Sequence, residues 1–460
     1  MFSKDFFNIK FGNVLDGHIS ISTYSYVLAL KFLPPRGHVV WVDTVHKLNT
    51  YIMIESIIKF NLIDNKNFHD KLETLSTSVL HHKTMKNVYQ SLQELVDASN
   101  SVFVTLKTEP KGKCYYPFFL REPFSLKDVD FCSLIDPEHL QRLKDRKIIP
   151  LVCMLSENWK LFNFEPNRIF RNSPYYNIIK QLEKHNVREE DVVWLTCNKY
   201  QVQDPRIKSK FIHFDFFLEQ QKVLPNKFLP LTEIKHRYIS MARGVPRHHR
   251  FAMTYLLHKN DLARHGAISC AGYENFSYQG SAETTDDYIK KLTHFDSSSF
   301  TKFKSILPLV IDNNTTEIVV PEHESYQSPI NLHQDGRDES HLFQNVFLNV
   351  VNETHQPDDT VFITEKTYRS INYCRPFVIN GDSGSLQYLK EMGFRHLTVW
   401  WDESYDTDDD HTKITKICNI VEYVSGLDIG ELQTLYQAML PILEHNYKVL
   451  KLYEQWSKLN

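Results

Sequence analysis

The feature of this chain that most constrains its fold is a series of short apolar segments separated by longer stretches with helical spacing. Near-continuous apolar strands that alternate with helices are typical of a parallel sheet covered by helices on both faces. Five segments of the first half have this strand-like character: residues 38–42, 101–106, 149–155, 191–195 and 210–214. We therefore expect an α/β fold in the first half.

The second half repeats the alternation. A strand at 237–241, a helical stretch at 248–264 that stops near Gly266, and a strand at 267–270 predict one βαβ unit. Farther on, strands are expected at 346–351 and 376–379, and helices at 364–373 and before Gly393. The predicted fold class is therefore α/β, with two Rossmann-like doubly wound domains that face one another across a cleft.

The domain boundaries follow from composition. Residues 223–233 contain Pro225 and Pro230 and have no apolar periodicity, which indicates a linker. This divides the 460 residues into an N-terminal domain at 1–230 and a C-terminal domain at 235–425. Residues 426–460 form a long helical pattern, and Pro441 is expected to kink it.

Composition excludes several classes of protein. The formal net charge is −3, so the overall charge balance does not require a polyanionic partner or an anionic membrane. The seven cysteines have no zinc-finger spacing and are interpreted as free thiols. Because the chain shows neither the apolar core of a signal peptide nor an apolar run of about 20 residues, we expect a cytoplasmic protein without a membrane span.

One stretch combines acidic residues with a lysine at the start of a predicted helix. A strand ends near Glu353, and Thr364 can cap a helix whose first turn holds Glu365 and Lys366. Ligands of α/β domains collect at such strand ends and helix N-termini. Glu353 and Glu365 could accept hydrogen bonds from ribose hydroxyls, and Lys366 could neutralise a phosphate. Alternatively, Glu365 only favours the helix dipole and Lys366 is solvated.

A second stretch concentrates cations between a strand and a helix. Ser240 ends the strand, and Arg243, Arg247, two histidines and Arg250 follow. Cations oppose the macrodipole at a helix N-terminus, so this cluster is unfavourable unless an anion lies among them. Arginine forks suit a diphosphate. A solvated basic loop is the alternative.

Together the two stretches resemble the donor domain of the α1,3-fucosyltransferase family, which has the GT-B fold. In that family a Ser-Asn segment and a downstream Arg precede a Glu-Asn segment and a Thr-Glu-Lys helix start. The similarity covers about residues 235–410, and segments 375–390 and 400–406 resemble glycosyltransferase-like proteins of phages and large DNA viruses. The matching residues are Ser240, Arg250, Glu353, Thr364, Glu365 and Lys366.

The resemblance implies a function and a set of roles. The chain would move a sugar from a nucleotide diphosphate donor to an acceptor hydroxyl, with inversion, without a metal and without any cofactor besides the donor. Arg243, Arg247, Arg250 and Lys366 would face the diphosphate, while Ser240, Glu353, Thr364 and Glu365 complete the donor site. The C-terminal helix would cross back to the first domain.

The acceptor side requires a general base. Glu157, which follows an apolar strand of the first domain, is the candidate; a helix-turn glutamate capped by Ser156 is the alternative interpretation, and Asp43 is a weaker competitor. Asp406 and Asp408 to Asp410 are interpreted as a solvated acidic face rather than a metal site.

Two other functions stay open. Met241 and Ala242 follow Ser240 where the family has Asn, which suggests a non-catalytic nucleotide- or carbohydrate-binding protein of the same fold. The basic segment 237–250 also permits a glycosyltransferase that acts on a modified nucleic acid base, although a glycan or other hydroxyl acceptor is preferred.

Overall fold

The structure is a computed structural model, and every residue that it describes belongs to the unit formed by residues 59–460. The predicted strand at 38–42, Asp43 and Glu157 lie outside the described residues. The described ranges are 60–63, 103–106, 114–119, 130–154, 174–199, 207–215, 217–218, 231–242, 247–270, 272–275, 283–292, 295–311, 318–319, 340–354 and 361–459.

The first sheet is parallel, with strand order β2-β1-β3-β4-β5-β6. The expected strands at 101–106, 149–155, 191–195 and 210–214 are confirmed with small shifts at their ends, whereas β1 and β3 were not predicted. The strands are β1 (Phe60–Ile63), β2 (Phe103–Leu106), β3 (Tyr115–Phe119), β4 (Ile149–Met154), β5 (Val193–Thr196) and β6 (Lys210–His213).

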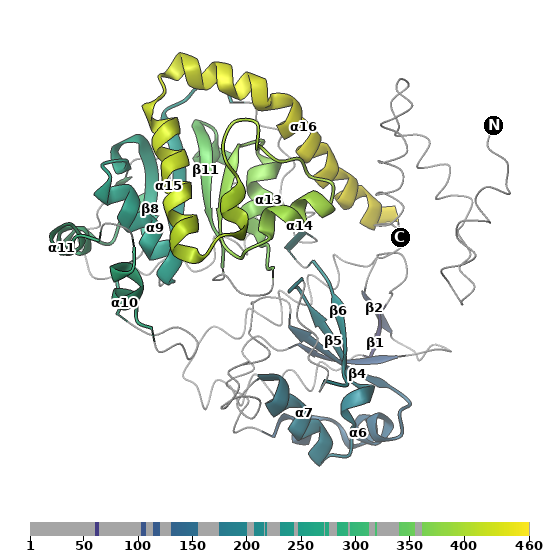
Figure 1. Cartoon of the computed structure of the whole chain (residues 1–460). Coiled ribbons are helices and arrows are strands. Elements are labelled where there is room, and N and C mark those ends of the chain that lie inside the picture. The colour runs from purple at the N-terminus through teal and green to yellow at the C-terminus, as the bar shows by residue number, and fades with distance from the viewer. Residues whose placement is uncertain are drawn as a thin grey trace, which may run out of the picture. The chain divides into compact units, whose positions relative to one another are not determined.

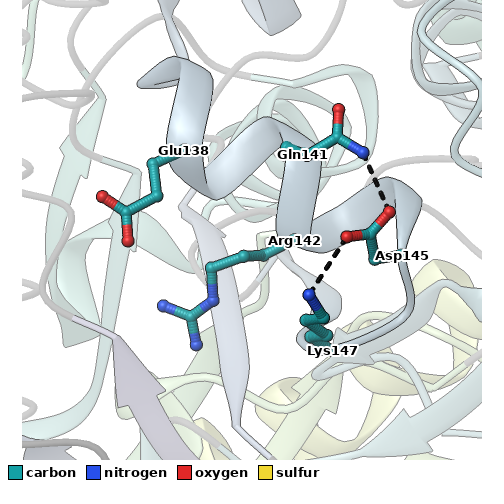
Figure 2. Close-up of a pocket in the computed structure, with 5 residues that line it drawn as sticks. All are labelled: Glu138, Gln141, Arg142, Asp145 and Lys147. Atoms are coloured by element: carbon teal, nitrogen blue, oxygen red, sulfur yellow. Dashed lines mark hydrogen bonds and ion pairs between the residues drawn. The ribbon is translucent and has the colours of Figure 1, made fainter.

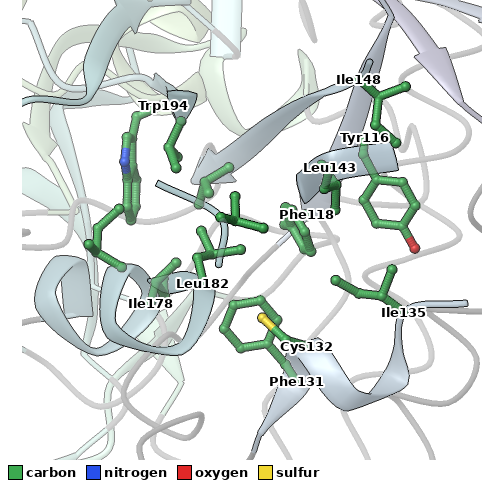
Figure 3. Packing of buried hydrophobic residues seen from close by; sticks show 14 of the residues in the cluster. Tyr116, Phe118, Phe131, Cys132, Ile135, Leu143, Ile148, Ile178, Leu182 and Trp194 are labelled. Atoms are coloured by element: carbon green, nitrogen blue, oxygen red, sulfur yellow. The ribbon is translucent and has the colours of Figure 1, made fainter. Parts of the chain in front are cut away.

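Helical segments cover this sheet and enclose an apolar core (Figure 3). Trp194 of β5 is fully buried and stacks on Phe211 with ring centroids 5.8 Å apart. Phe118 of β3 contacts Phe131 edge to face. The helical segments are η2 (Phe131–Leu134), α6 (Pro137–Lys144), α7 (Pro174–Lys184) and η4 (Glu189–Asp191).

The second sheet is also parallel and has the order β12-β11-β7-β8. Every residue of β8, β11 and β12 is buried, which explains why these strands read as continuous apolar segments. The strands are β7 (His236–Ala242), β8 (Gly266–Cys270), β11 (Val346–Asn352) and β12 (Phe377–Asn380). All four were predicted.

The order of the second sheet contains a reversal. The chain runs from β7 outward to β8, then returns to the other side of β7 to form β11 and β12. Right-handed crossovers in opposite directions place their helices on opposite faces. Accordingly, α9 (His248–Lys259) packs with α15 (Asp410–Gly426), while α13 (Glu365–Asn372) packs with α16 (Ile429–Leu459) (Figure 1).

Shorter elements complete the described part of this region. A two-stranded antiparallel ribbon joins β9 to β10. The elements are η6 (Ala263–His265), α10 (Thr285–Lys290), α11 (Ser297–Ser305), β9 (Val310–Ile311), β10 (Ile318–Val319), α12 (Ser340–Phe343), α14 (Ser385–Glu391) and η7 (Ser404–Thr407).

The predicted C-terminal helix is confirmed as α16, which contains Pro441. Its hydrogen bonds tie it to the second sheet's helices and loops: Lys451 Nζ donates to Asn372 Oδ1 at 2.9 Å, and Tyr453 donates to the Met392 carbonyl at 2.6 Å. Its return to the first domain stays a prediction. None of the described helices combines the length and the apolar character that crossing a membrane requires.

The structure thus confirms the α/β class with two parallel sheets. The finer prediction, two domains arranged as in GT-B enzymes with boundaries at 1–230, 235–425 and 426–460, remains an expectation.

Candidate functional site

The reversal in strand order marks one edge of the second sheet. Helix α9 begins after the carboxyl end of β7, and α13 begins after the carboxyl end of the neighbouring strand β11. Both helix N-termini therefore lie at the same edge, beside the point where the chain changes direction. In open α/β sheets this topological switch point is where ligands bind.

A ladder of polar side chains crosses this edge. Asn380, at the end of β12, donates to Asn352 Oδ1 at 2.8 Å, and Asn352 donates to the Ser240 hydroxyl at 2.9 Å. Asn380 also donates to the carbonyl of His249, in the first turn of α9, at 3.1 Å. All three ladder side chains are buried. Ser240 is thus where the sequence placed it, but it serves this ladder, which joins three strands to α9.

Glu353 follows directly after β11 and is fully buried. One carboxylate oxygen accepts from the N–H of Thr364 at 3.1 Å and from the hydroxyl of Thr367 at 2.6 Å. The other accepts from the hydroxyl of Thr364 at 2.6 Å and from the N–H of Thr354 at 3.1 Å. Four donors surround the carboxylate, so Glu353 fixes the start of α13. Its predicted contact with ribose stays a prediction.

The carbonyl of Glu353 connects the two helix starts. Arg250 Nε donates to it at 2.8 Å, and His249 Nε2 donates to it at 3.1 Å. Arg250 is 8% exposed. Arg250 belongs to the first turn of α9, so its guanidinium lies at the positive end of the helix dipole. This turn contains no acidic residue that would balance the charge.

Lys366 lies at the start of α13. Its Nζ donates to Glu365 Oε1 at 2.8 Å, to Thr354 Oγ1 at 3.0 Å and to Thr364 Oγ1 at 3.1 Å. The Lys366 side chain is 24% exposed and that of Glu365 is 13% exposed. Thr364 is the N-cap, as predicted, and its hydroxyl accepts from the Lys366 N–H at 3.4 Å. The side chains of Lys366 and Glu365 are therefore partly exposed, whereas Thr364, which Lys366 contacts, is buried.

Most of the predicted donor-site residues converge at this edge. A continuous path of contacts runs from Arg250 through Glu353 and Thr364 to Lys366, although more than 100 residues separate its ends in the sequence. Arg247 is the partly exposed N-cap residue of α9. Arg243 lies outside the described residues. Asn352, Asn380 and Thr367 were not predicted, although the two asparagines end neighbouring strands.

The acidic segment at residues 406–410 departs in part from the prediction of a solvated face. Asp406 is buried and accepts from two backbone N–H groups in the first turn of α14, at 3.0 and 3.2 Å. Asp409 caps α15, and Asp408 pairs with Lys416 at 2.7 Å. The prediction is wrong for Asp406, because it weighed composition alone, whereas this buried carboxylate caps α14. Asp409 is exposed, and Asp408 and Asp410 are half-buried. In the described part of the chain, they do not form a group of metal ligands.

The half-buried Asp410 and the buried Lys413 lie close to the same edge. Lys413 Nζ donates to the Gly381 carbonyl at 2.9 Å, and Tyr288 donates to Asp410 Oδ2 at 3.3 Å. Burial raises the pKa of Asp410 to about 7, while the nearby Lys413 charge opposes this shift. Burial also lowers the pKa of Lys413, and the surrounding carboxylates oppose that change.

A hollow of about 450 Å³ lies elsewhere, beside α6 (Figure 2). Asp145 accepts there from Gln141 at 2.8 Å and pairs with Lys147 at 3.2 Å. Glu138 and Arg142 complete the lining. Because Lys147 precedes β4, this hollow lies at the amino end of that strand rather than at a carboxyl edge, and we assign it no role.

In comparisons with known proteins, no family model, no curated sequence and no solved structure matches the chain.

The first prediction concerns Glu353. Glu353→Gln replaces one accepting carboxylate oxygen by an NH₂ group, which cannot accept the hydrogen bonds that this oxygen receives. Because buried hydrogen bonds are lost, we expect the free energy of unfolding to fall by about 1–3 kcal/mol. Urea unfolding of the variant and the wild type measures this difference in stability. The control Glu444→Gln, on the exposed face of α16, should shift stability by less than about 0.5 kcal/mol. Equal stability of Glu353→Gln and the wild type would contradict the positioning role.

The second prediction concerns Asp410. Its folded-state pKa of about 7 lies above the ordinary 3.8, so the folded chain holds a proton that the unfolded chain releases. The proton on Asp410 therefore contributes fully to the stability of the folded chain below about pH 4, and this contribution is lost as the pH rises through about 7. Asp410→Asn resembles the protonated acid.

We therefore expect the melting temperature of Asp410→Asn, relative to wild type, to increase between pH 5 and pH 8. The groups facing Asp410 include Lys413, Tyr288, Asp382 and Asp409. Asp402→Asn is the control, because hydrogen bonds from Ser404 lower the pKa of Asp402. A difference for Asp410→Asn that does not change with pH would refute the assignment.

Proposed function

We propose that the chain is a glycosyltransferase that binds a nucleotide diphosphate sugar at the carboxyl edge of the second sheet. The observation that carries this proposal is the convergence of Arg247, Arg250 and Lys366 at two adjacent helix N-termini beside the topological switch point. Two helix dipoles and three cations favour an anion there more than a single helix N-terminus does.

The exposure of each side chain determines the role that we assign to it. Arg247 and Lys366 reach the surface and are assigned to the phosphate oxygens, and Glu365 beside Lys366 is assigned to a donor hydroxyl. Arg250 contributes its charge from a buried position that the Glu353 carbonyl fixes. We assign Ser240, Glu353 and Thr364 to positioning, because all three are buried and hydrogen-bonded within the protein. Ser240 accepts from Asn352, and Glu353 accepts from Thr364.

The transfer itself would be a single displacement. The acceptor oxygen forms a bond to the anomeric carbon while the bond from that carbon to the diphosphate breaks. The nucleoside diphosphate leaves with the negative charge, which the arginines and Lys366 stabilise. The acceptor proton passes to a general base, for which Glu157 of the first domain is proposed. The configuration inverts, and the arrangement of domains is of the GT-B type.

Binding tests the donor site first. The wild type should be stabilised by at least one nucleoside diphosphate in a thermal-shift panel. Lys366→Met removes a charged phosphate contact of about 1.5–3 kcal/mol, so diphosphate affinity should fall about 10- to 100-fold. Affinity for the nucleoside should change little, as calorimetry can show. The control Lys448→Met removes an exposed charge of α16 and should bind as wild type does.

Equal losses of diphosphate and nucleoside affinity in Lys366→Met would reject the phosphate assignment. Incubation with nucleotide sugars and acceptor glycans then tests transfer, by mass spectrometry of the glycosylated acceptor and the released diphosphate. Binding without turnover over the whole panel would favour the non-catalytic alternative.

A further inference from the structure

A cluster of three possible metal ligands lies in the first-sheet region. Asp130 precedes η2, Cys132 lies within η2, and His185 follows the last turn of α7. One ligand atom from each residue lies within 4.8 Å of the others, and this is the one such group among the described residues. This cluster was not predicted from the sequence, because 53 positions separate Cys132 from His185.

The contact between Asp130 and His185 has the spacing of a metal site. His185 Nε2 lies 3.1 Å from both carboxylate oxygens of Asp130. In a tetrahedral zinc site with bonds of 2.0–2.1 Å, nitrogen and oxygen ligands are about 3.3 Å apart. A metal ion could therefore replace the shared proton with little movement of either side chain.

Asp130 is directed toward this cluster instead of the helix that it precedes. Although it occupies the N-cap of η2, its side chain makes no capping hydrogen bond. Burial tends to raise the pKa of Asp130, but hydrogen bonds and charges from His185 and Lys184 outweigh it and lower that pKa. The carboxylate is thus held ionised beside the ring nitrogen.

Cys132, the third residue of the cluster, has a fixed position. It is fully buried, and Figure 3 shows it beside Phe131 at the margin of the core. The Phe131 N–H donates to Gln181 Oε1 of α7 at 2.9 Å, so η2 is tied to the helix that carries His185 into place. Burial raises the pKa of Cys132, and the Asp130 charge raises it further. A bound cation would reverse that effect.

We propose that Asp130, Cys132 and His185 bind one Zn²⁺ ion. A thiolate with an imidazole selects zinc or a similar transition metal over Mg²⁺ or Ca²⁺. One thiolate and one carboxylate neutralise the divalent charge, which allows the ion to sit at the margin of the core. Asp130 and His185 are 32% and 21% exposed, so water can occupy the fourth position.

Lys184 provides an internal check of this proposal. Its Nζ lies 3.1 Å from Asp130 Oδ2, where it competes electrostatically with a bound cation. Lys184→Met should therefore strengthen metal binding. In a simple ion pair of Asp130 with His185 and Lys184, the same change creates no metal affinity.

Titration of the metal-free full chain with Co²⁺ is the experiment. We expect one ion per chain and the charge-transfer absorption of a cobalt thiolate, which Zn²⁺ displaces. Cys132→Ala should abolish this absorption, while Cys153→Ala, a change at another buried cysteine, should keep it. His185→Gln should weaken binding by more than the roughly 10- to 100-fold that loss of an outer partner costs.

Absence of stoichiometric binding to the wild type would overturn the proposal, as would cobalt absorption that persists in Cys132→Ala. If Cys132→Ala does not fold, as judged by circular dichroism, His185→Gln decides, because this partly exposed residue can change without disturbing the core. Unaltered Co²⁺ affinity in His185→Gln would reject the site.

Discussion

The candidate site depends on the hydrogen bonds that the buried carboxylate of Glu353 accepts. It accepts hydrogen bonds from Thr354, Thr364 and Thr367, so it joins the residue that follows it after β11 to the start of α13. Gly381, after the neighbouring strand, approaches so closely that an added Cβ would lie 2.7 Å from the Glu353 Cβ. The absence of a side chain there lets the two strand ends pack while the glutamate keeps its donors.

The sequence predicts the parts of the fold that burial on both faces makes apolar. Strands β7, β8, β11 and β12 were found because nearly all of their residues are buried. Strand β3 was missed because Pro117 lies in its middle, a residue that normally argues against an inner strand. Strand β1 was missed because Asn61, a residue type depleted in strands, interrupts its apolar residues. The α/β class was therefore predictable, but the order of the first sheet was not.

The candidate site was predictable as a set of residue types at strand ends and helix starts. Lys366, Arg250 and Glu353 do converge, yet the sequence could not show that Glu353 is surrounded by donors, because those bonds depend on tertiary packing. The same reason explains Asp406, whose acidic neighbours suggested solvent although it caps a helix 20 residues away in the chain. Partners distant in sequence decide whether a polar residue supports a site or contacts its ligand.

Amide hydrogen exchange with and without a saturating nucleoside diphosphate tests the central claim most directly, namely that this edge of the second sheet holds the donor diphosphate. Binding should slow exchange in residues 247–253 and 361–368, which begin or precede α9 and α13, and leave α16 unchanged. Protection confined to other segments, with both helix starts unaffected while the ligand is bound, would contradict the account.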